Sequence, residues 1–248
     1  MQEIYEWFRW LNQATGINLT IVYDSYDRAR MIDGFVNTIY LSFVCLGLSV
    51  VIGVVGAWLQ GSPLKWTRRL VNGYIQLFRN TPPLVQMYFF FFALGSLMPR
   101  MENEWGIMEP ILSNWHWAIL SLSFFAGSFN VEIFRSGIEA VPRATVEAAE
   151  SLGYNRLQTY MHVVLPLALR VCLPALNNNL VNLVKTTTLA YAIAVPEMLY
   201  VANQIWSDSL NVPEMMTFLL FAYVLLVGLL VHVMHRWERA MRLPGFGA

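Results

Sequence analysis

The chain has 248 residues, of which 56% are hydrophobic and 13% are charged, and its formal net charge is zero. Because a soluble domain carries about 25% charged residues, a chain this apolar must expose much of its surface to lipid. A net charge of zero gives no electrostatic basis for binding nucleic acid. The two cysteines, Cys45 and Cys172, lie in apolar segments, so the sequence predicts neither a disulfide framework nor a metal site.

The first 33 residues contain acids, aromatic residues and three arginines, but no short apolar core followed by a cleavage site. They do not resemble a signal peptide, so the first span must direct the chain to the membrane. We expect residues 1–33 to form an amphipathic segment on the outer membrane surface.

Crossing a bilayer core of about 30 Å takes about 20 mostly apolar helical residues. Five segments approach this standard, near residues 34–59, 83–98, 116–138, 167–199 and 215–235. The second is short but rich in aromatic residues, and Pro82-Pro83 suits a helix start. The fourth is the least hydrophobic, and its three consecutive threonines and Pro196 predict a broken helix.

Basic residues in the short loops predict the orientation, because Lys and Arg concentrate on the cytoplasmic side. They form three groups: Lys65, Arg68, Arg69 and Arg79; Arg143, Arg156 and Arg170; and Arg236, Arg239 and Arg242. The second loop has only Arg100, and the fourth has no basic residue. This pattern places the N-terminus outside and the C-terminus inside, although the N-terminal arginines run against it. The sequence therefore predicts an all-α integral membrane protein with about five transmembrane helices in residues 34–238 and a cytoplasmic tail at 239–248.

The third loop, residues 139–166, predicts a helix, a turn and a second helix. Its first half contains strong helix formers, namely Ala144, Glu147, Ala148, Ala149 and Glu150. Gly153 follows at a position suited to a left-handed helix end, and Pro166 marks the start of the fourth span. Small side chains allow another backbone to approach, and the two glutamates offer carboxylates to basic groups. A generic connector could share this composition, but the full spacing is far more specific.

Four motifs carry a family resemblance. Glu147-Ala148-Ala149 is followed by Gly153 and then by Val163-Val164-Leu165-Pro166, which resembles the coupling loop of the inner-membrane subunits of bacterial ABC importers. The others are Phe78 to Gln86, Ala140-Val141-Pro142 and Asn182 to Leu189, joined by the closing Arg242-Leu243-Pro244-Gly245. Together they resemble the polar amino-acid branch, which contains histidine, arginine, glutamine and glutamate/aspartate permeases. Ala144-Thr145 replaces the Gly-Gln pair that is usual in that branch.

The resemblance implies a type I importer permease fold and a system of several parts in the bacterial inner membrane. Two permease chains, identical or paralogous, would form the channel, a cytoplasmic ATPase dimer would drive it, and a periplasmic binding protein would deliver the substrate. The coupling residues would be Glu147, Ala148, Ala149, Glu150, Gly153, Leu165 and Pro166. The sequence has no G-x-x-x-x-G-K-(S/T) phosphate loop, so ATP and Mg²⁺ belong to the partner and this chain is a non-catalytic subunit without a cofactor of its own.

Polar residues at membrane depth are candidates for the substrate path. Asn178, Asn182 and Lys185 recur at helical spacing and form one stripe of the fourth span. Further candidates are Thr186, Thr187, Ser128 and Asn130. Because polar groups are costly in lipid, this stripe either lines a path for solutes or makes hydrogen bonds in a dimer interface.

In the third span, Glu132 and Arg135 are three residues apart and can pair on one helical face. The family that the motifs resemble has a matching Glu–Arg pair, which implies that Glu132 and Arg135 support the architecture rather than select the substrate.

The leading hypothesis is an importer subunit for a polar amino acid or a derivative such as an opine. The alternative is a secondary transporter or channel that works alone, which predicts internal repeats and several buried charges. We find no repeat and few charges at membrane depth. An intramembrane enzyme is disfavoured because the sequence has no H-E-x-x-H or G-x-S-x-G motif. Lys185 favours an acidic solute, whereas Glu132 and Glu197 favour a basic one, so the sequence leaves the substrate open.

Overall fold

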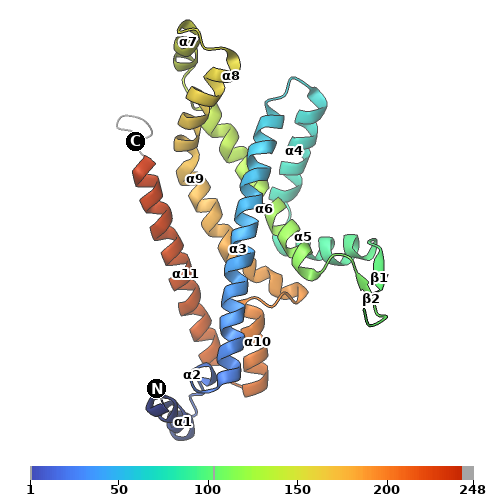
Figure 1. Ribbon diagram of the computed structural model, residues 1–248, viewed down its shortest axis with the longest axis vertical. Helices are drawn as coiled ribbons and strands as arrows, with labels where there is room; N and C mark the ends of the chain where they lie inside the picture. Colours follow the sequence, from blue (N-terminus) through green and yellow to red (C-terminus); the bar gives the residue numbers. More distant parts are fainter. Residues whose placement is uncertain (1, 103, 242–248) are drawn as a thin grey trace. The chain divides into compact units, whose positions relative to one another are not determined.

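The structure is a computed structural model that describes residues 2–102 and 104–241 (Figure 1). The closing Arg242 to Gly245 motif, and with it most of the predicted tail, lies outside the described residues. The chain forms two compact units. Unit 1 contains three segments: the N-terminal segment up to Val44, Leu84–Ser121 and Val184–Gly228. Unit 2 contains Cys45–Pro83, Leu122–Leu183 and the segment from Leu229 onward.

Four helices in the described part of the chain have the length and composition of membrane spans. They are α3 (Ser25–Gln60), α6 (Asn114–Glu139), the helical segment Arg156–Ile193 and α11 (Val212–Met241). These helices confirm the first, third, fourth and fifth predicted spans. Because α3 is continuous from Ser25, the expected boundary at residue 33 lies inside a helix and not between two structural parts.

The second predicted span is shorter than expected. Helix α5 (Pro83–Tyr88) continues as the π-helix η1 (Phe89–Leu94), and these 12 residues extend about 18 Å, well short of a bilayer core of about 30 Å. The preceding helix α4 (Lys65–Arg79) ends at Asn80. Pro82-Pro83 separates α4 from α5, because proline lacks an N–H donor and disfavours a helical residue before it. The number of spanning-length helices among the described residues is therefore four and not five.

The connection between η1 and α6 is also not purely helical. It contains β1 (Arg100–Glu102) and β2 (Met108–Pro110), which pair antiparallel with Arg100 opposite Pro110. All six strand residues are exposed to solvent in the isolated chain. The all-α prediction therefore holds for the spans, while a small β-ribbon lies in the second loop.

Unit 1 is built around α10 (Met198–Ser209). Its core joins residues of α3, α10 and α11, namely Met31, Met198, Val201, Ala202, Ile205, Met215 and Leu219. A Cβ atom on Gly34 would lie 3.0 Å from the Val201 side chain, so α3 approaches α10 closely because this residue has no side chain. The short helices α1 (Gln2–Thr15) and α2 (Thr20–Tyr23) precede α3.

Unit 2 depends on close contacts between helices at glycines. A Cβ atom on Gly127 of α6 would lie 2.6 Å from Ile52 of α3, and one on Gly137 of α6 would lie 2.8 Å from the carbonyl oxygen of Ala168. Small residues let transmembrane helices approach closely and gain van der Waals contacts, which supply much of the association energy in lipid. Unit 2 therefore holds α3, α6 and α9 (Leu165–Thr186) at close range.

The fourth span is broken, as predicted. After Thr186 the chain changes from α9 to the 3₁₀-helix η3 (Thr187–Ile193), and it leaves the helix at Ala194, whose φ of 59° lies in the left-handed region. The Asn114 side-chain amide donates a hydrogen bond of 2.6 Å to the Ala194 carbonyl oxygen and so stabilises this helix end. The span therefore ends at Ile193 rather than at residue 199.

Candidate coupling site and polar residues at membrane depth

The third loop forms a compact helix–turn–helix between α6 and α9 (Figure 1). Helix α7 (Arg143–Ser151) is followed by its C-cap Leu152 and then by Gly153, whose φ is +89°. The Tyr154 N–H donates to the Ala149 carbonyl oxygen (3.2 Å), and the Gly153 N–H donates to the Glu150 carbonyl oxygen (3.0 Å). These two bonds are those of a Schellman motif, which satisfies carbonyl groups left open at a helix end. The predicted role of Gly153 as a left-handed helix end is confirmed.

The second helix of the turn begins with a capping box. The Gln158 N–H donates to the Asn155 side-chain oxygen (2.9 Å), and the Asn155 N–H donates to the Gln158 side-chain oxygen (2.9 Å). These reciprocal bonds satisfy two donors at the start of a helix. Helix α8 (Arg156–Thr159) follows directly from this start.

The second helix of the turn then runs without a break into α9. Helix α8 continues as the π-helix η2 (Tyr160–Val164), and η2 continues into α9. Pro166 is the second residue of α9, in agreement with the predicted start of the fourth span, but no break separates that span from the second helix of the hairpin. Because proline cannot donate to the preceding turn, a local widening into a π-helix lets the helix continue past it.

The base of this hairpin is fixed to α6 and α9. Val141 and Val164, at its two ends, form a buried cluster with Ala168 of α9. Ile138, Val146, Tyr160 and Leu167 pack against this cluster. Because protein interiors pack densely and deform little, a displacement of the hairpin would be transmitted to the ends of both helices.

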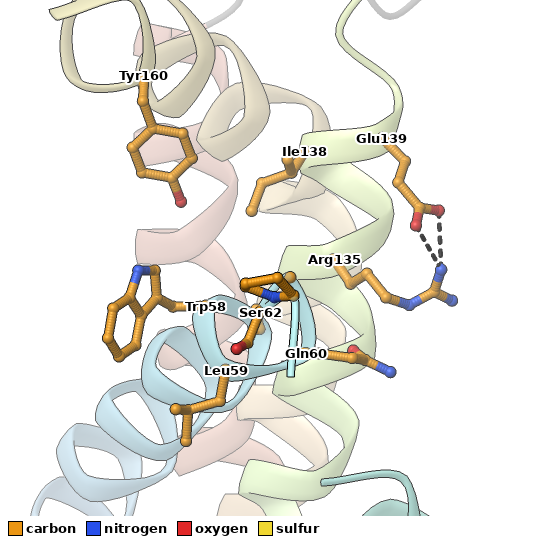
Figure 2. A pocket seen from close by; sticks show the side chains of 11 residues that line it. Trp58, Leu59, Gln60, Ser62, Arg135, Ile138, Glu139 and Tyr160 are labelled. Atoms are coloured by element: carbon orange, nitrogen blue, oxygen red, sulfur yellow. Dashed lines mark hydrogen bonds and ion pairs between the residues drawn. The ribbon is translucent and has the colours of Figure 1, made fainter. Parts of the chain in front are cut away.

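A cavity separates part of this base from the end of α3 (Figure 2). Its volume is about 480 Å³, and its lining includes Trp58, Gln60, Arg135, Glu139 and Tyr160. Figure 2 shows Arg135 and Glu139 on one side of the cavity and Trp58 and Tyr160 on the other. The hairpin is therefore packed tightly against α6 and α9 and more loosely against the end of α3.

The structure brings Glu132 and Arg135 together, as the spacing predicted. Their side chains form an ion pair of 2.8 Å, and the same guanidinium contacts Glu139 at 2.8 Å. The Gln60 side-chain amide also donates to Glu132 (3.4 Å), which connects the end of α3 to α6. These contacts join the end of α3 to α6 within unit 2.

Most of the predicted coupling residues are exposed at the tip of the hairpin. Glu147, Ala148, Glu150 and Gly153 are exposed, Leu165 and Pro166 are half-buried, and Ala149 is buried. Ala149 thus packs inward while its neighbours face outward, as expected for successive positions of one short helix.

The same tip carries apolar residues that the sequence analysis did not single out. Leu152 is 83% exposed and Leu157 is 71% exposed, and Tyr154 and Met161 are also exposed. Large apolar side chains gathered at an exposed turn are typical of a protein interface. Because these residues lie around the turn between two short helices, the sequence alone could have indicated that they are exposed.

Asn130, a predicted path residue, is completely buried in unit 2. Its side-chain oxygen accepts a hydrogen bond of 2.7 Å from Asn179, and its amide nitrogen donates to the Ser49 hydroxyl (3.2 Å). Asn179 also donates to the Ala126 carbonyl oxygen (3.0 Å). These bonds connect α3, α6 and α9, so Asn130 joins helices and reaches no surface in this conformation.

Two further path candidates are also buried. The Ser128 hydroxyl donates to the Phe125 carbonyl oxygen (2.7 Å), and the Thr187 hydroxyl donates to the Val184 carbonyl oxygen (2.7 Å). The Ser128 hydroxyl is therefore used within α6, and the Thr187 hydroxyl connects the start of η3 to the last turn of α9. Thr186 is half-buried at the end of α9.

The predicted stripe on α9 is exposed. Asn178, Asn182 and Lys185 all have exposed side chains in the isolated chain. Within residues 2–102 and 104–241, Lys185 forms no ion pair with a carboxylate. Lys185 thus presents an ammonium group to something outside this chain, either a solute or another subunit.

Four helices of spanning length among the described residues, with an exposed helical hairpin between α6 and α9, define a multi-span membrane protein. The sequence profile of the family described as "Binding-protein-dependent transport system inner membrane component" matches residues 49–242. The chain belongs to this family of transporter permease subunits.

Named relatives cover most of the chain. The glutamate/aspartate import permease protein GltJ of Escherichia coli strain K12 is 31% identical over 226 residues, which are 85% of this chain and 92% of GltJ. The probable glutamine ABC transporter permease protein GlnM of Bacillus subtilis is 28% identical and covers 85% of this chain and 91% of its own. The nopaline transport system permease protein NocM of Agrobacterium fabrum is 29% identical, with 80% and 81% covered.

Solved structures show the same fold. An amino acid ABC transporter crystallised with histidines has a chain with a TM-score of 0.74 and 24% identity, covering 86% of this chain and 94% of that chain. The MetNI methionine ABC transporter in an inward-facing conformation has a chain with a TM-score of 0.69 and 20% identity, with 89% and 100% covered. The fold is therefore that of type I importer permeases, in agreement with the prediction from the motifs.

Proposed function

We propose that this chain is the transmembrane subunit of an ATP-driven importer for a polar amino acid or an amino-acid derivative such as an opine. Relatives named for glutamate/aspartate, glutamine and nopaline transport support this substrate class. Substrate would arrive from a periplasmic binding protein, and the complex would lie in the bacterial inner membrane with a second permease chain, identical or paralogous.

The exposed hairpin of residues 139–166 carries the proposal. It presents Glu147, Glu150 and the apolar side chains of Leu152 and Leu157 to the outside, while its base is packed against α6 and α9. A cytoplasmic ATPase dimer that holds ATP and Mg²⁺ would bind this tip. Closure of the dimer would then displace the ends of two membrane helices, as the anchoring at Val141 and Val164 requires.

The exposed stripe of α9 would face the solute. The exposed Asn178 amide can exchange hydrogen bonds with a polar substrate, and the Lys185 ammonium can pair with a carboxylate, a group that every amino acid carries. A stripe used only between two permease chains would instead contact groups of the second chain. Replacement of Lys185 by methionine distinguishes these two roles.

Purification of the complex from cells that produce the permease and the ATPase tests the proposal. Replacing Glu147 by arginine reverses a charge at the tip, so we expect the fraction of ATPase that copurifies to fall by at least about tenfold, the loss expected for a charge pair at an interface. Glu102→Arg, an exposed reversal in the β-ribbon, is the matched control and should leave copurification unchanged. Copurification that is equal in all three proteins, with intact transport by Glu147→Arg, would contradict the proposal.

A further inference from the structure

The N-terminal segment concentrates arginines and tyrosines in unit 1. Each of its three arginines lies over a tyrosine ring: Arg9 over Tyr23 (5.8 Å), Arg28 over Tyr5 (5.1 Å) and Arg30 over Tyr26 (4.4 Å). These are the arginines that ran against the predicted orientation. Their presence on the predicted outer side is explained by the cation–π contacts and by the bilayer interface, where tyrosine and arginine are both favoured.

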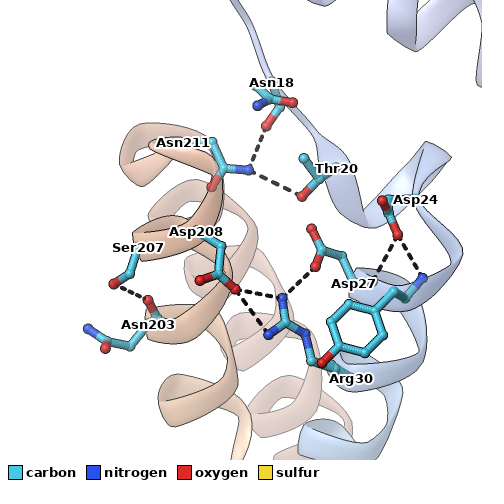
Figure 3. A network of polar contacts seen from close by, with 10 residues as sticks. Asn18, Thr20, Asp24, Asp27, Arg30, Asn203, Ser207, Asp208 and Asn211 are labelled. Atoms are coloured by element: carbon cyan, nitrogen blue, oxygen red, sulfur yellow. Dashed lines mark hydrogen bonds and ion pairs between the residues drawn. The ribbon is translucent and has the colours of Figure 1, made fainter.

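The arginines at the start of α3 differ in how their charge is balanced. Arg30 pairs with Asp27 (2.6 Å) and Asp208 (3.1 Å) (Figure 3). Arg28 donates through Nη1 to the Tyr5 hydroxyl (3.0 Å) and to the Val22 carbonyl oxygen (2.9 Å), both neutral acceptors. Among residues 2–102 and 104–241 it forms no ion pair with a carboxylate. The charge of Arg28 is therefore held in place but not compensated.

Arg28 lies at an apolar groove of about 610 Å³. The other residues of the lining belong to α2, α3, α10 and α11 and are Ile21, Val22, Met31, Ile32, Phe35, Met198, Phe218, Phe221, Ala222 and Leu225. Arg28 is the only charged residue in this lining. An apolar groove between two membrane-spanning helices, with one cation at their ends, fits a molecule with a hydrocarbon chain and an anionic head.

Hydrogen bonds next to the groove connect the segment before α3 to the start of α11. The Asn211 side-chain amide donates to the Asn18 carbonyl oxygen (2.8 Å) and to the Thr20 hydroxyl (3.4 Å) (Figure 3). The Asn18 N–H donates to the Glu214 carboxylate at 2.8 Å. The Tyr23 hydroxyl donates to the Asn18 side-chain oxygen (2.5 Å). The segment before α3, which carries Ile21 and Val22 of the lining, is thus tied to the start of α11.

We propose that this groove binds one anionic phospholipid, with an acyl chain along α3 and α11 and the phosphate on Arg28. The neighbouring helix α1 supports this assignment, because it leaves Ile4, Trp7 and Trp10 more than half exposed. Aromatic and apolar side chains of this kind partition into the headgroup region of a bilayer. This inference concerns lipid binding alone and does not depend on the transported substrate.

Native mass spectrometry of the purified, delipidated transporter complex, titrated with phosphatidylglycerol or phosphatidylcholine, tests the head group. The wild type should bind phosphatidylglycerol more tightly. Arg28→Gln should weaken phosphatidylglycerol binding about tenfold, the loss expected for one charge-assisted hydrogen bond, and abolish the preference. Arg28→Lys keeps the positive charge but removes the guanidinium that contacts Tyr5 of α1, so it should retain part of the preference. This variant therefore separates the effect of the charge from that of the contact with α1. Arg100→Gln, an exposed control in the β-ribbon, should behave like the wild type.

A second pair of variants tests the groove without touching Arg28. Ala222→Trp fills the groove and should lower phosphatidylglycerol binding, whereas Val224→Trp adds the same ring outside the lining and should not. Equal binding of the two lipids by the wild type, or equal effects of Arg28→Gln and Arg100→Gln, would mean annular lipid only and overturn the proposal. Unchanged binding by Ala222→Trp would overturn the placement of the acyl chain.

Discussion

The side-chain amide of Asn179 donates a hydrogen bond of 2.7 Å to the side-chain oxygen of Asn130, which is completely buried. Asn130 in turn donates to Ser49, so one pair of amides joins α3, α6 and α9 inside unit 2. In lipid, a polar group without a partner is costly, and a satisfied network of this kind fixes which helices meet. This relationship gives Asn130 a structural role in this conformation.

Replacing Asn130 by alanine should therefore destabilise the protein. Loss of two side-chain hydrogen bonds should lower the free energy of unfolding by about 1–2 kcal/mol. The measurement is thermal or denaturant unfolding of the purified complex. Asn178→Ala is the matched control, because Asn178 directly precedes Asn179 in α9 and its side chain is exposed. This replacement should change the free energy of unfolding by less than about 0.5 kcal/mol. A larger effect of Asn178→Ala than of Asn130→Ala would contradict the structural role.

The turn of the hairpin should be sensitive to side chains at Gly153. At a φ of +89°, a β-branched residue is strained, so Gly153→Val should destabilise the turn by about 1–2 kcal/mol and reduce ATPase binding. Asparagine tolerates left-handed conformations, and Gly153→Asn should retain most of the binding. Copurification of the ATPase measures both variants. A valine variant that binds the ATPase as well as the wild type would show that the left-handed turn is not required.

The exposed tip predicts an apolar contribution to the same interface. Leu152 and Leu157 are the most exposed apolar residues of the hairpin, so Leu152→Ser and Leu157→Ser should each weaken ATPase binding without destabilising the permease. Affinity measured by titration of the ATPase against the permease in nanodiscs gives the effect. Leu210→Ser, an 87% exposed position in unit 1, is the control. Equal affinities in all three variants would exclude these leucines from the interface.

Lys185 distinguishes a solute path from an interface between permease chains. If its ammonium pairs with a substrate carboxylate, Lys185→Met should raise the KM of uptake about tenfold with little effect on stability. Arg170→Met removes an exposed charge elsewhere on α9 and should leave KM unchanged. A Lys185 variant that keeps its KM but separates the two permease chains would support the interface role instead.

The orientation can be tested with single cysteines. We expect Ser207→Cys, which is exposed in α10, to react from outside intact cells with a membrane-impermeant maleimide. Ser151→Cys, exposed at the end of α7, should react only after the cells are opened. The native Cys45 and Cys172 are buried and provide little background. Labelling of Ser151→Cys in intact cells would reverse the assigned orientation.

The sequence was informative where a local signal decides the structure. Length and apolar content identified the four long helices, the threonine run marked the change of helix after Thr186, and Gly153 marked the end of α7. Each of these features depends on neighbouring residues along the chain. The same holds for Glu132 and Arg135, whose pairing follows from helical spacing.

The sequence was less informative where packing decides the structure. The burial of Asn130 depends on which helix faces it, and hydrophobic periodicity does not identify the partner helix. The continuous helix through Pro166 depends on a π-helical turn that composition does not reveal. Pro82 and Pro83 limit where the second apolar helix can begin. Pairing between residues 100–102 and 108–110 forms the β-ribbon that follows this helix. Hydropathy alone measures neither effect.

The central claim is that a separate ATPase, acting through the hairpin, drives transport. Uptake of labelled glutamate, glutamine, arginine and nopaline into proteoliposomes, with and without the ATPase and ATP, tests it most directly. The binding protein for each solute must be present on the outer side. We predict uptake of at least one solute only when ATPase and ATP are both present, and its loss in Glu147→Arg. Uptake by the permease alone, driven by an ion gradient, would contradict the claim and favour a self-sufficient secondary transporter.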